Sequence, residues 1–452
     1  MTPSNSHVLT LCLLLLTLTS LLSTSATPFN TRYELDPSSL HTHTPRYHRT
    51  SARPHKRQHS PTPPSNKSII LDFQCNLPGQ VSTWDNEKVG LPRESDNTCT
   101  KAHATFLRAI ERLQRVIYFQ IPIRLQARFA SLCPSDSTIA SCRAKMDVLG
   151  SAGPSAWHGW DPSAAQALGV DPDYLYPSAL AKQYAPDEFD GQTPDISASF
   201  NSDPLWWFPT IEHPIGSPND NEWNADQAWT KQWGNIQQYL PVKLKGKVFD
   251  FEQIVLHELI HGLGFISSWY TWIDGDSILP SSLDTAANGT VLGLTKPYLF
   301  NKWMADTANG VWMKEYEAQI IAAAYQIAQT LPDDAIWTQA FKASDAYKLP
   351  VRLFDTIATT PGAIAIYYPV RSYVDNVVLR YAVLHTPSEF SDGSTFSHVD
   401  SGAYSGTGSY LMRPFGTPST GLDAMRPVGE PIDEVVLGIL RAMGYATALT
   451  PL

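Results

Sequence analysis

Two histidines and a glutamate lie close together in the stretch VLHELIHGLGF, residues 255–265. On an α-helix, His257 and His261 are one turn apart on one face, so both imidazoles can reach the same metal ion. Glu258 is displaced round the helix, where it ligates poorly but can take a proton from a metal-bound water. Zinc suits this arrangement because it lowers the pKa of such a water to about 7. The motif therefore predicts a hydrolytic zinc site, and the alternative is a pair of solvated or core histidines.

A catalytic zinc needs three protein ligands and an open fourth position. In the commonest extended motif a third histidine follows Gly264 by three residues, but that position is Ser267. We expect His103 on a helix, as a surface or core residue, and His158 and His213 in loops. The remaining histidines of the body are His385 and His398, and His398 lies in the glycine-rich stretch FSHVDSGAYSGTGSYLMRPFG.

The blocks HELIHGLGF, SHVD and LMRP together resemble the leishmanolysin-like metalloproteases of the metzincin clan. In that family an insertion follows the helix, a distant histidine supplies the third ligand, and a methionine turn lies under the metal. The resemblance implies His257, His261 and His398 as zinc ligands, Glu258 as general base and Met412 as the turn methionine. It also implies that DISASFNSD, residues 195–203, is the edge strand of the sheet, where an extended peptide would pair.

Two alternatives concern individual positions of this site. A zincin can use a downstream glutamate as its third ligand, and Glu315 and Glu317 in KEYEAQ are the candidates. Met425 competes with Met412 for the methionine turn, and either methionine could instead be ordinary core packing. Substitution of the third ligand and of the base would test the assignment.

The elements that must position these residues form an α+β pattern. Asp250 can cap the helix that bears the motif, with Gln253 completing a capping box, and Gly264 ends it as a turn away from the metal requires. Apolar periodicity predicts further helices and strands. The strands are at 68–73, 121–132, 195–203 and, as a pair, 363–384; the helices are at 100–116, 314–331 and 432–445. With the resemblance, this predicts a metzincin-like zincin catalytic domain with a mixed twisted sheet.

The chain divides into five predicted regions. An apolar run followed by small residues makes 1–26 a signal peptide, with a short membrane anchor as the alternative. Residues 27–66 are rich in Pro, His and Ser and are expected to be disordered, as a tail or as a propeptide cleaved at Lys56-Arg57. We expect an N-terminal catalytic lobe at 67–267, an insertion or second lobe at 268–397, and the third ligand, methionine turn and closing helix at 398–452.

The cysteines fit an exported protein. Removal of the signal peptide leaves four, and pairing by proximity predicts the disulfides Cys75–Cys99 and Cys133–Cys142. Glycosylation sequons begin at Asn66 and Asn288, as expected for an extracellular surface.

Composition limits the classes of function. The chain of 452 residues is 43% hydrophobic and 17% charged, which indicates a globular body, and its net charge of -10 argues against nucleic acid as a partner. No stable membrane insertion is expected, and the tryptophans Trp206, Trp207, Trp269 and Trp272 are assigned to the core or surface. The sequence thus predicts a secreted zinc endopeptidase acting on a protein or peptide. The alternative is a non-catalytic secreted binding or wall-associated protein.

Overall fold

A mixed five-stranded sheet lies beside the predicted active-site helix. The structure, a computed structural model, describes residues 29–35, 47–50, 68–77, 80–85, 98–132, 148–208, 248–272, 275–331, 333–371, 377–418, 421–422 and 432–449. The strands of this sheet are β3 (Ile69–Leu77), β4 (Gln80–Asp85), β6 (Ile123–Ala130), β7 (Gly150–Pro154) and β10 (Ile196–Asn201). Their order is β4-β3-β6-β10-β7; β3, β6 and β10 are parallel, and the two outer strands are antiparallel to their neighbours. This mixed architecture confirms the α+β prediction at the level of fold class.

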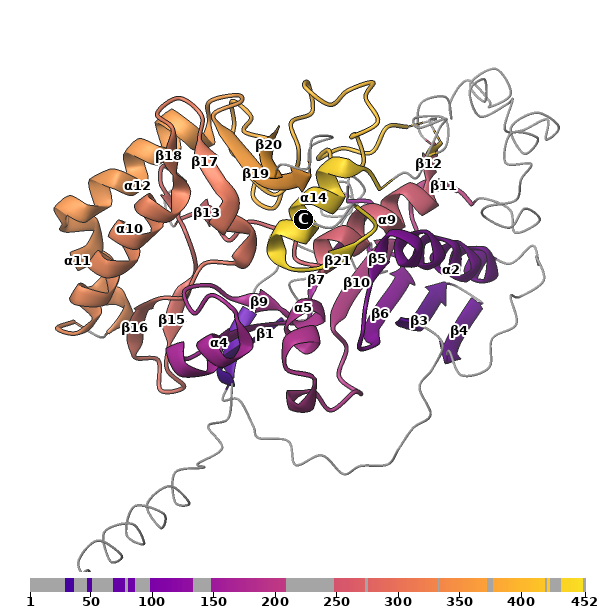
Figure 1. Cartoon of the computed structure of the whole chain (residues 1–452), viewed down its shortest axis with the longest axis horizontal. Coiled ribbons are helices and arrows are strands. Elements are labelled where there is room, and N and C mark those ends of the chain that lie inside the picture. The colour runs from indigo at the N-terminus through magenta and orange to yellow at the C-terminus, as the bar shows by residue number, and fades with distance from the viewer. Residues whose placement is uncertain are drawn as a thin grey trace, which may run out of the picture.

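Two helices pack along one face of the sheet. They are α2 (Thr98–Val116) and α9 (Phe251–Gly262), and Figure 1 shows α2 lying across β6 and β3 with α9 beside it. The face is apolar because alternate residues of β3 and β6 are buried and their neighbours are more exposed. Phe106 of α2, Phe200 of β10 and Phe251 of α9 meet with ring centroids 5.0 to 5.7 Å apart. The hydrophobic core therefore begins directly under the helix that carries the motif.

The prediction that residues 195–203 form the edge strand is wrong. β10 lies between β6 and β7, and all its residues are buried. The edge position was implied by the family resemblance alone. In the structure the polar side chains of β10 are hydrogen-bonded inside: Ser197 Oγ lies 2.7 Å from Ser155 Oγ, and Asn201 Nδ2 donates to Val148 O at 3.0 Å. Within the described residues, β7 is the outer strand on this side.

Residues 268–397 form a second group of elements. The strands are β13 (Tyr270–Thr271), β14 (Ile278–Leu279), β15 (Leu283–Thr285), β16 (Val291–Leu294), β17 (Met304–Asp306), β18 (Val311–Trp312), β19 (Ile364–Arg371) and β20 (Val377–Val383). The helices are η5 (Leu299–Trp303), α10 (Met313–Ala328), α11 (Asp334–Ala343), η6 (Asp345–Tyr347), α12 (Lys348–Leu353) and η7 (Phe354–Ala358). The sheet order is β18-β17-β19-β20, and the predicted hairpin at 363–384 is thereby confirmed.

The closing helix ties the chain together. Helix α14 (Glu434–Met443) packs on β19, and β21 (Ala446–Thr447) pairs with β5 (Ile117–Tyr118) at the end of α2. Tyr445 Oη donates to Leu263 O at 2.9 Å, directly after α9. One hydrophobic cluster runs from Ile69 to Tyr445 and includes the buried Trp269 and Trp272. The two groups of elements therefore share a core.

Two strands of a smaller sheet lie within residues 27–66, and the rest of that segment lies outside the described residues. Within that segment β1 (Phe29–Leu35) and β2 (Tyr47–Thr50) form strands, in the order β2-β1-β8-β9 with β8 (Ala156–Trp160) and β9 (Tyr176–Pro177). Composition gives too few apolar side chains for a core, but pairing with β8 supplies backbone hydrogen bonds that composition does not count. The remaining elements are α4 (Pro162–Leu168), α5 (Ser178–Tyr184), η3 (Pro186–Glu188), β11 (Leu205–Trp207) and β12 (Val248–Asp250).

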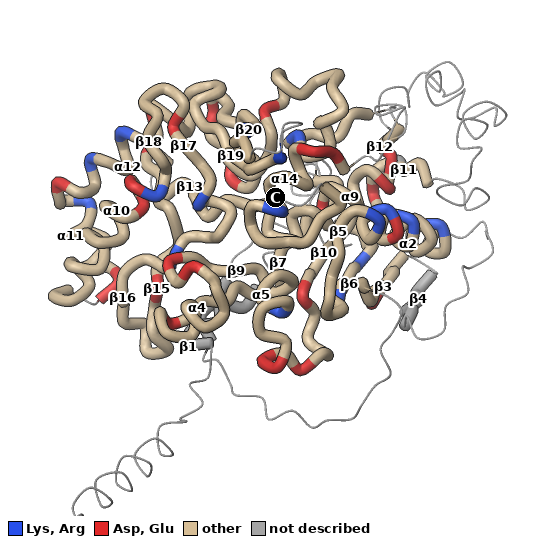
Figure 2. The backbone as a smooth tube through the Cα atoms, viewed as in Figure 1, with Lys and Arg blue, Asp and Glu red and all other residues tan. Residues whose placement is uncertain are grey.

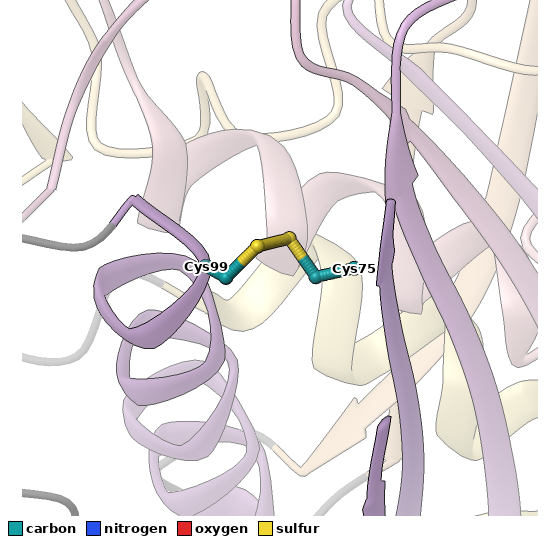
Figure 3. Close-up of a disulfide and its surroundings, with 2 residues drawn as sticks. All are labelled: Cys75 and Cys99. Atoms are coloured by element: carbon teal, nitrogen blue, oxygen red, sulfur yellow. A yellow bond between two sulfur atoms is a disulfide. The ribbon is translucent and has the colours of Figure 1, made fainter. Parts of the chain in front are cut away.

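The predicted disulfide between Cys75 and Cys99 is confirmed. It links β3 to the first turn of α2, as Figure 3 shows. Cys133, Cys142, Lys56-Arg57, Asn66 and residues 1–26 lie outside the described residues. Asn288 is exposed in the turn between β15 and β16. Among the described helices, none has both the length and the apolar character to cross a bilayer.

Candidate metal centre

The N-terminus of helix α9 is fixed by a cap and by buried charges. Asp250 Oδ1 accepts hydrogen bonds from the amides of Glu252 and Gln253 at 2.9 and 3.3 Å, which confirms the predicted cap. The buried Glu252 carboxylate pairs with Arg108 and Arg112 of α2, at 3.3 and 2.7 Å, and Figure 2 shows basic residues gathered along that helix. Burial opposes ionisation, but the two guanidinium groups hold the pKa of Glu252 below its ordinary value. These contacts set the position of the helix that carries the two histidines.

The loop that carries His398 is held at both sides by backbone hydrogen bonds. His385 N donates to His398 O, and Val399 N donates to Met412 O, each at 2.8 Å. Phe396, two residues before His398, is fully buried at a φ of 66°, and it is the only non-glycine residue with positive φ that the described part of the chain contains. A left-handed conformation costs a non-glycine residue about 1–2 kcal/mol, so the surrounding packing must hold it there.

The three predicted histidines converge. The Nε2 atoms of His257, His261 and His398 lie 3.1 Å from one another in all three pairs. In the described residues these three form the one group of histidine, cysteine and carboxylate side chains close enough to hold a metal ion. The structure thus brings together side chains that are widely separated in the chain.

Each ring is oriented by a backbone carbonyl on its far side. His257 Nδ1 lies 2.8 Å from Leu411 O, His261 Nδ1 lies 2.7 Å from Phe265 O, and His398 Nδ1 lies 3.0 Å from Ser394 O. A carbonyl only accepts, so each Nδ1 must carry the proton and donate. Each Nε2 then presents its lone pair to the other two. Three lone pairs at this distance repel one another unless a cation lies between them, which is the chemistry of a metal site.

Burial keeps all three imidazoles neutral. It lowers the pKa of His257 to about 4 and that of His261 to about 3, and it holds the pKa of His398 well below its ordinary value. The neighbouring imidazoles lower the pKa of His261 and His398 further, while the carbonyl partners oppose the shift. Neutral imidazole is the form that ligates metals, so the site is ready to bind one at neutral pH.

Glu258 is buried beside this cluster, with 7% of its surface exposed. Burial raises the pKa of its carboxyl to about 8, opposed by a hydrogen bond from the backbone of Ala152 in β7. Gly150, at the start of the same strand, comes so near that an added Cβ would lie 3.2 Å from Glu258 Cγ. The glycine therefore lets the strand approach the carboxyl group closely.

The histidines and the carboxyl group open into a cleft of about 640 Å³. Its walls come from β7 and the residues before it, from α9, and from the loops at 391–398 and 411–416. Most of the lining is apolar or glycine, and its apolar side chains include Leu149, Phe249, Ile254, Leu411 and Phe415. A few polar groups converging in an apolar cleft are typical of a ligand-binding site.

The family model that matches is described as SPBPB7E8-like, and it covers residues 89–223. No curated protein and no solved structure matches the chain. The matched residues include α2, β6, β7 and β10, and they end before α9. They therefore contain one wall of the cleft but none of the three converging histidines.

Behind the cluster, a buried polar network joins both ligand-bearing segments to residues 268–397. Ser267 N, just past α9, donates to Ser397 Oγ at 3.1 Å, and Ser267 Oγ donates to Asn301 Oδ1 at 3.0 Å. Asn301 Nδ2 donates to Glu317 Oε1 at 2.8 Å, and Trp269 Nε1 donates to the same oxygen at 3.0 Å. Ser267 stands where the extended motif would have its third histidine. Its hydrogen bond to Ser397 supports the loop that carries His398.

The two glutamates considered as an alternative third ligand, Glu315 and Glu317, lie away from the histidine cluster. Glu317 is buried against Trp269 and Asn301, and Glu315 is exposed on α10, so neither belongs to the histidine cluster. His103 is a core residue stacked on Phe73, with ring centroids 5.5 Å apart.

The other predicted positions fall in different surroundings. His158 was expected in a loop but lies in β8, where its Nε2 is 3.0 Å from Ser178 Oγ. Met412 is fully buried next to Leu411, and its role as a turn methionine stays a prediction. His213 and Met425 lie outside the described residues.

Gly264 occupies the turn predicted for it. It follows α9 at a φ of 95°, and an added Cβ would lie 2.7 Å from Pro177 Cγ. Sequence reasoning missed Ser397, Asn301 and the orienting carbonyls. A backbone acceptor carries no side-chain signal, and a serine beside a histidine has no distinctive one.

Proposed function

We propose that the chain is a secreted zinc endopeptidase that hydrolyses protein or peptide substrates, with Glu258 as its general base. The observation that carries the proposal is the convergence of three Nε2 lone pairs beside a buried carboxyl group in an open cleft. That arrangement supplies three ligands and leaves the cleft side free, as a catalytic metal site requires. The signal-like N-terminus and the disulfide support an extracellular setting.

The donor set fits zinc. In a tetrahedral zinc site with bonds of about 2.05 Å, ligand nitrogens are separated by about 3.3 Å, close to the 3.1 Å between these Nε2 atoms. Neutral imidazoles fixed by carbonyl hydrogen bonds are typical ligands for this ion. His257, His261 and His398 would hold it.

The chemistry follows from what the chain places around the ion. Zinc bound there would supply Lewis acidity to the attacking water and to the substrate carbonyl. The charge of that ion would lower the raised pKa of Glu258. The ionised carboxylate would then take the proton from the water and return it to the departing amine. The hydrogen bond with Ala152 holds that carboxyl group against β7, so its direction in the cleft is fixed.

Strand β7 offers a binding surface for an extended peptide. It pairs antiparallel with β10 and is the outer strand of the described sheet on this side. Edge strands bind peptides by backbone hydrogen bonds, with side-chain pockets giving selectivity. The peptide pairing first expected for residues 195–203 is therefore proposed for β7, of which Gly150, Ser151 and Ala152 also line the cleft.

The test compares Glu258→Gln with wild type. We expect the variant to retain zinc, because the ligands are untouched, and to cleave casein or a fluorogenic peptide about a thousandfold more slowly because it has lost the base. Glu315→Gln, an exposed glutamate on α10, is the matched control and should keep wild-type activity. Metal content is measured alongside kcat and KM, with chelation and zinc reconstitution of the wild type.

Two outcomes would contradict the proposal. Undiminished cleavage by Glu258→Gln would remove its role as the base. Zinc-loaded wild type that cleaves no peptide, after removal of the N-terminal segment as well, would instead support the binding-protein alternative.

A further inference from the structure

The cleft has an uneven distribution of charge. Of the described residues that line it, Arg413 is the one lysine or arginine, and Glu258 is the one aspartate or glutamate. Glu258 is committed to the reacting centre in the function proposed above. Arg413 is not used there, although its charge is permanent at any working pH.

Arg413 has no carboxylate partner among the described residues. Its Nε donates to Tyr410 O at 3.4 Å, and its Nη2 donates to Thr417 Oγ1 at 2.8 Å. Both acceptors are neutral, and a guanidinium has five N–H donors, so part of the planar fork remains available. Burial lowers the pKa of Arg413, and no carboxylate opposes this shift. The charge is thus partly desolvated without being neutralised.

The surroundings strengthen the effect of this charge. Its loop packs against the opposite wall at Gly416, where an added Cβ would lie 3.1 Å from Ile254 Cδ1 and from Leu149 Cδ1. The neighbouring Phe415 is 66% exposed and lines the same cleft. A charge pair between apolar walls is stronger than one in open water, because the local dielectric constant is lower.

The loop that carries Arg413 also contacts one of the three histidines, and both line the same cleft. Leu411 O, two residues before Arg413, accepts the hydrogen bond from His257 Nδ1. A substrate bound at the histidine cluster would therefore lie next to this loop.

We propose that Arg413 determines specificity by binding a carboxylate of the peptide close to the bond that is cleaved. This inference rests on the proposed peptidase function and names its substrate class, an acidic peptide. The selectivity is local, since the chain as a whole carries a net charge of -10 and does not attract acidic substrates by its overall field. Arginine suits the task because its fork binds a carboxylate in bidentate geometry.

The experiment uses zinc-loaded full-length protein and internally quenched peptides that differ at one position, with Glu, Gln or Lys placed in turn on either side of the cleaved bond. A second set carries a free or an amidated C-terminus, which distinguishes a side-chain carboxylate from a terminal one. We expect kcat/KM to favour the carboxylate over its neutral amide by about tenfold at one position, the size of a charge-assisted hydrogen bond.

Variants of Arg413 should change that ratio in a graded order. Arg413→Lys keeps part of the preference, Arg413→Gln removes it, and Arg413→Glu reverses it towards the lysine peptide. The ratio of two substrates on one preparation does not depend on the fraction of active protein, so partial misfolding does not obscure it. Arg352→Gln, an exposed arginine on α12, is the matched control and should leave the ratio unchanged.

A binding measurement separates this inference from the proposed function. Zinc-loaded Glu258→Gln is titrated with the same labelled peptides, and fluorescence anisotropy gives the dissociation constants. Arg413-dependent binding of acidic peptides by a protein that cleaves none would uphold the inference and overturn the peptidase. Cleavage or binding without any carboxylate preference, or a preference that survives Arg413→Gln, would overturn the inference.

Discussion

At the residue scale, the metal-binding capacity of the site depends on what holds each imidazole from behind. Three different carbonyls, at Leu411, Phe265 and Ser394, select the tautomer in which Nε2 is free. Phe265 and Ser394 are close in sequence to the histidines that they orient, His261 and His398, whereas Leu411 is far in sequence from His257. The rings are therefore oriented before a metal binds, which reduces the conformational entropy lost on binding.

Substitution His398→Ala should weaken zinc binding by a hundredfold or more, because it leaves two ligands from one helix; removing an outer-shell partner alone costs about 10–100-fold. The measurement is competition with a chromophoric chelator at pH 7, followed by peptidase activity at saturating zinc. His385→Ala is the control, since His385 is hydrogen-bonded through its backbone to His398 but lies outside the cluster. Equal zinc affinity in the two variants would move the third ligand elsewhere.

At the element scale, the C-terminal end of helix α9 is held in position as firmly as its N-terminal end. Tyr445 Oη holds Leu263 O, and Gly264 then turns the chain so that Phe265 O reaches His261. The turn thus contributes directly to ligand orientation.

Gly264→Ala should destabilise the protein by about 2–4 kcal/mol and lower its zinc affinity. The left-handed backbone costs an alanine about 1–2 kcal/mol, and the new Cβ would also press on Pro177 at 2.7 Å. The matched control is Gly310→Ala, with a φ of 66° and no atom within 4 Å of the added Cβ, which isolates the backbone contribution. Urea unfolding of both variants gives the difference, and an equal effect would mean that crowding at Gly264 contributes nothing.

The predictability of these elements follows the range of the interactions that define them. Helix α9, its Asp250 cap and the hairpin at 363–384 were predicted because periodicity and capping are local. The position of residues 195–203 in the sheet was not predicted correctly, because strand order depends on pairing between distant segments. The motif likewise identified His257, Glu258 and His261 directly, whereas His398 came only from a family resemblance. No local pattern encodes the Ser267–Ser397 contact.

At the scale of the whole molecule, residues 268–397 are part of the architecture of the site. They share the hydrophobic core with the first sheet, and through Asn301 and Glu317 they support the segments on both sides of the histidine cluster. The global stability of the protein and the geometry of the site should therefore be coupled through this network.

Glu317 makes that coupling dependent on pH. Burial raises the pKa of its carboxyl to about 7 from an ordinary value of 4.5, against the hydrogen bonds from Asn301 and Trp269, and its Oε2 has no partner among the described residues. Since the folded-state pKa is raised, the stabilisation is complete below about pH 4.5 and is lost as the pH rises through 7. Relative to wild type, Glu317→Gln should gain about 2–3 kcal/mol of unfolding free energy between pH 5 and pH 8. Urea unfolding across this range measures the difference, Glu315→Gln should show none, and a flat difference for Glu317→Gln would contradict the raised pKa.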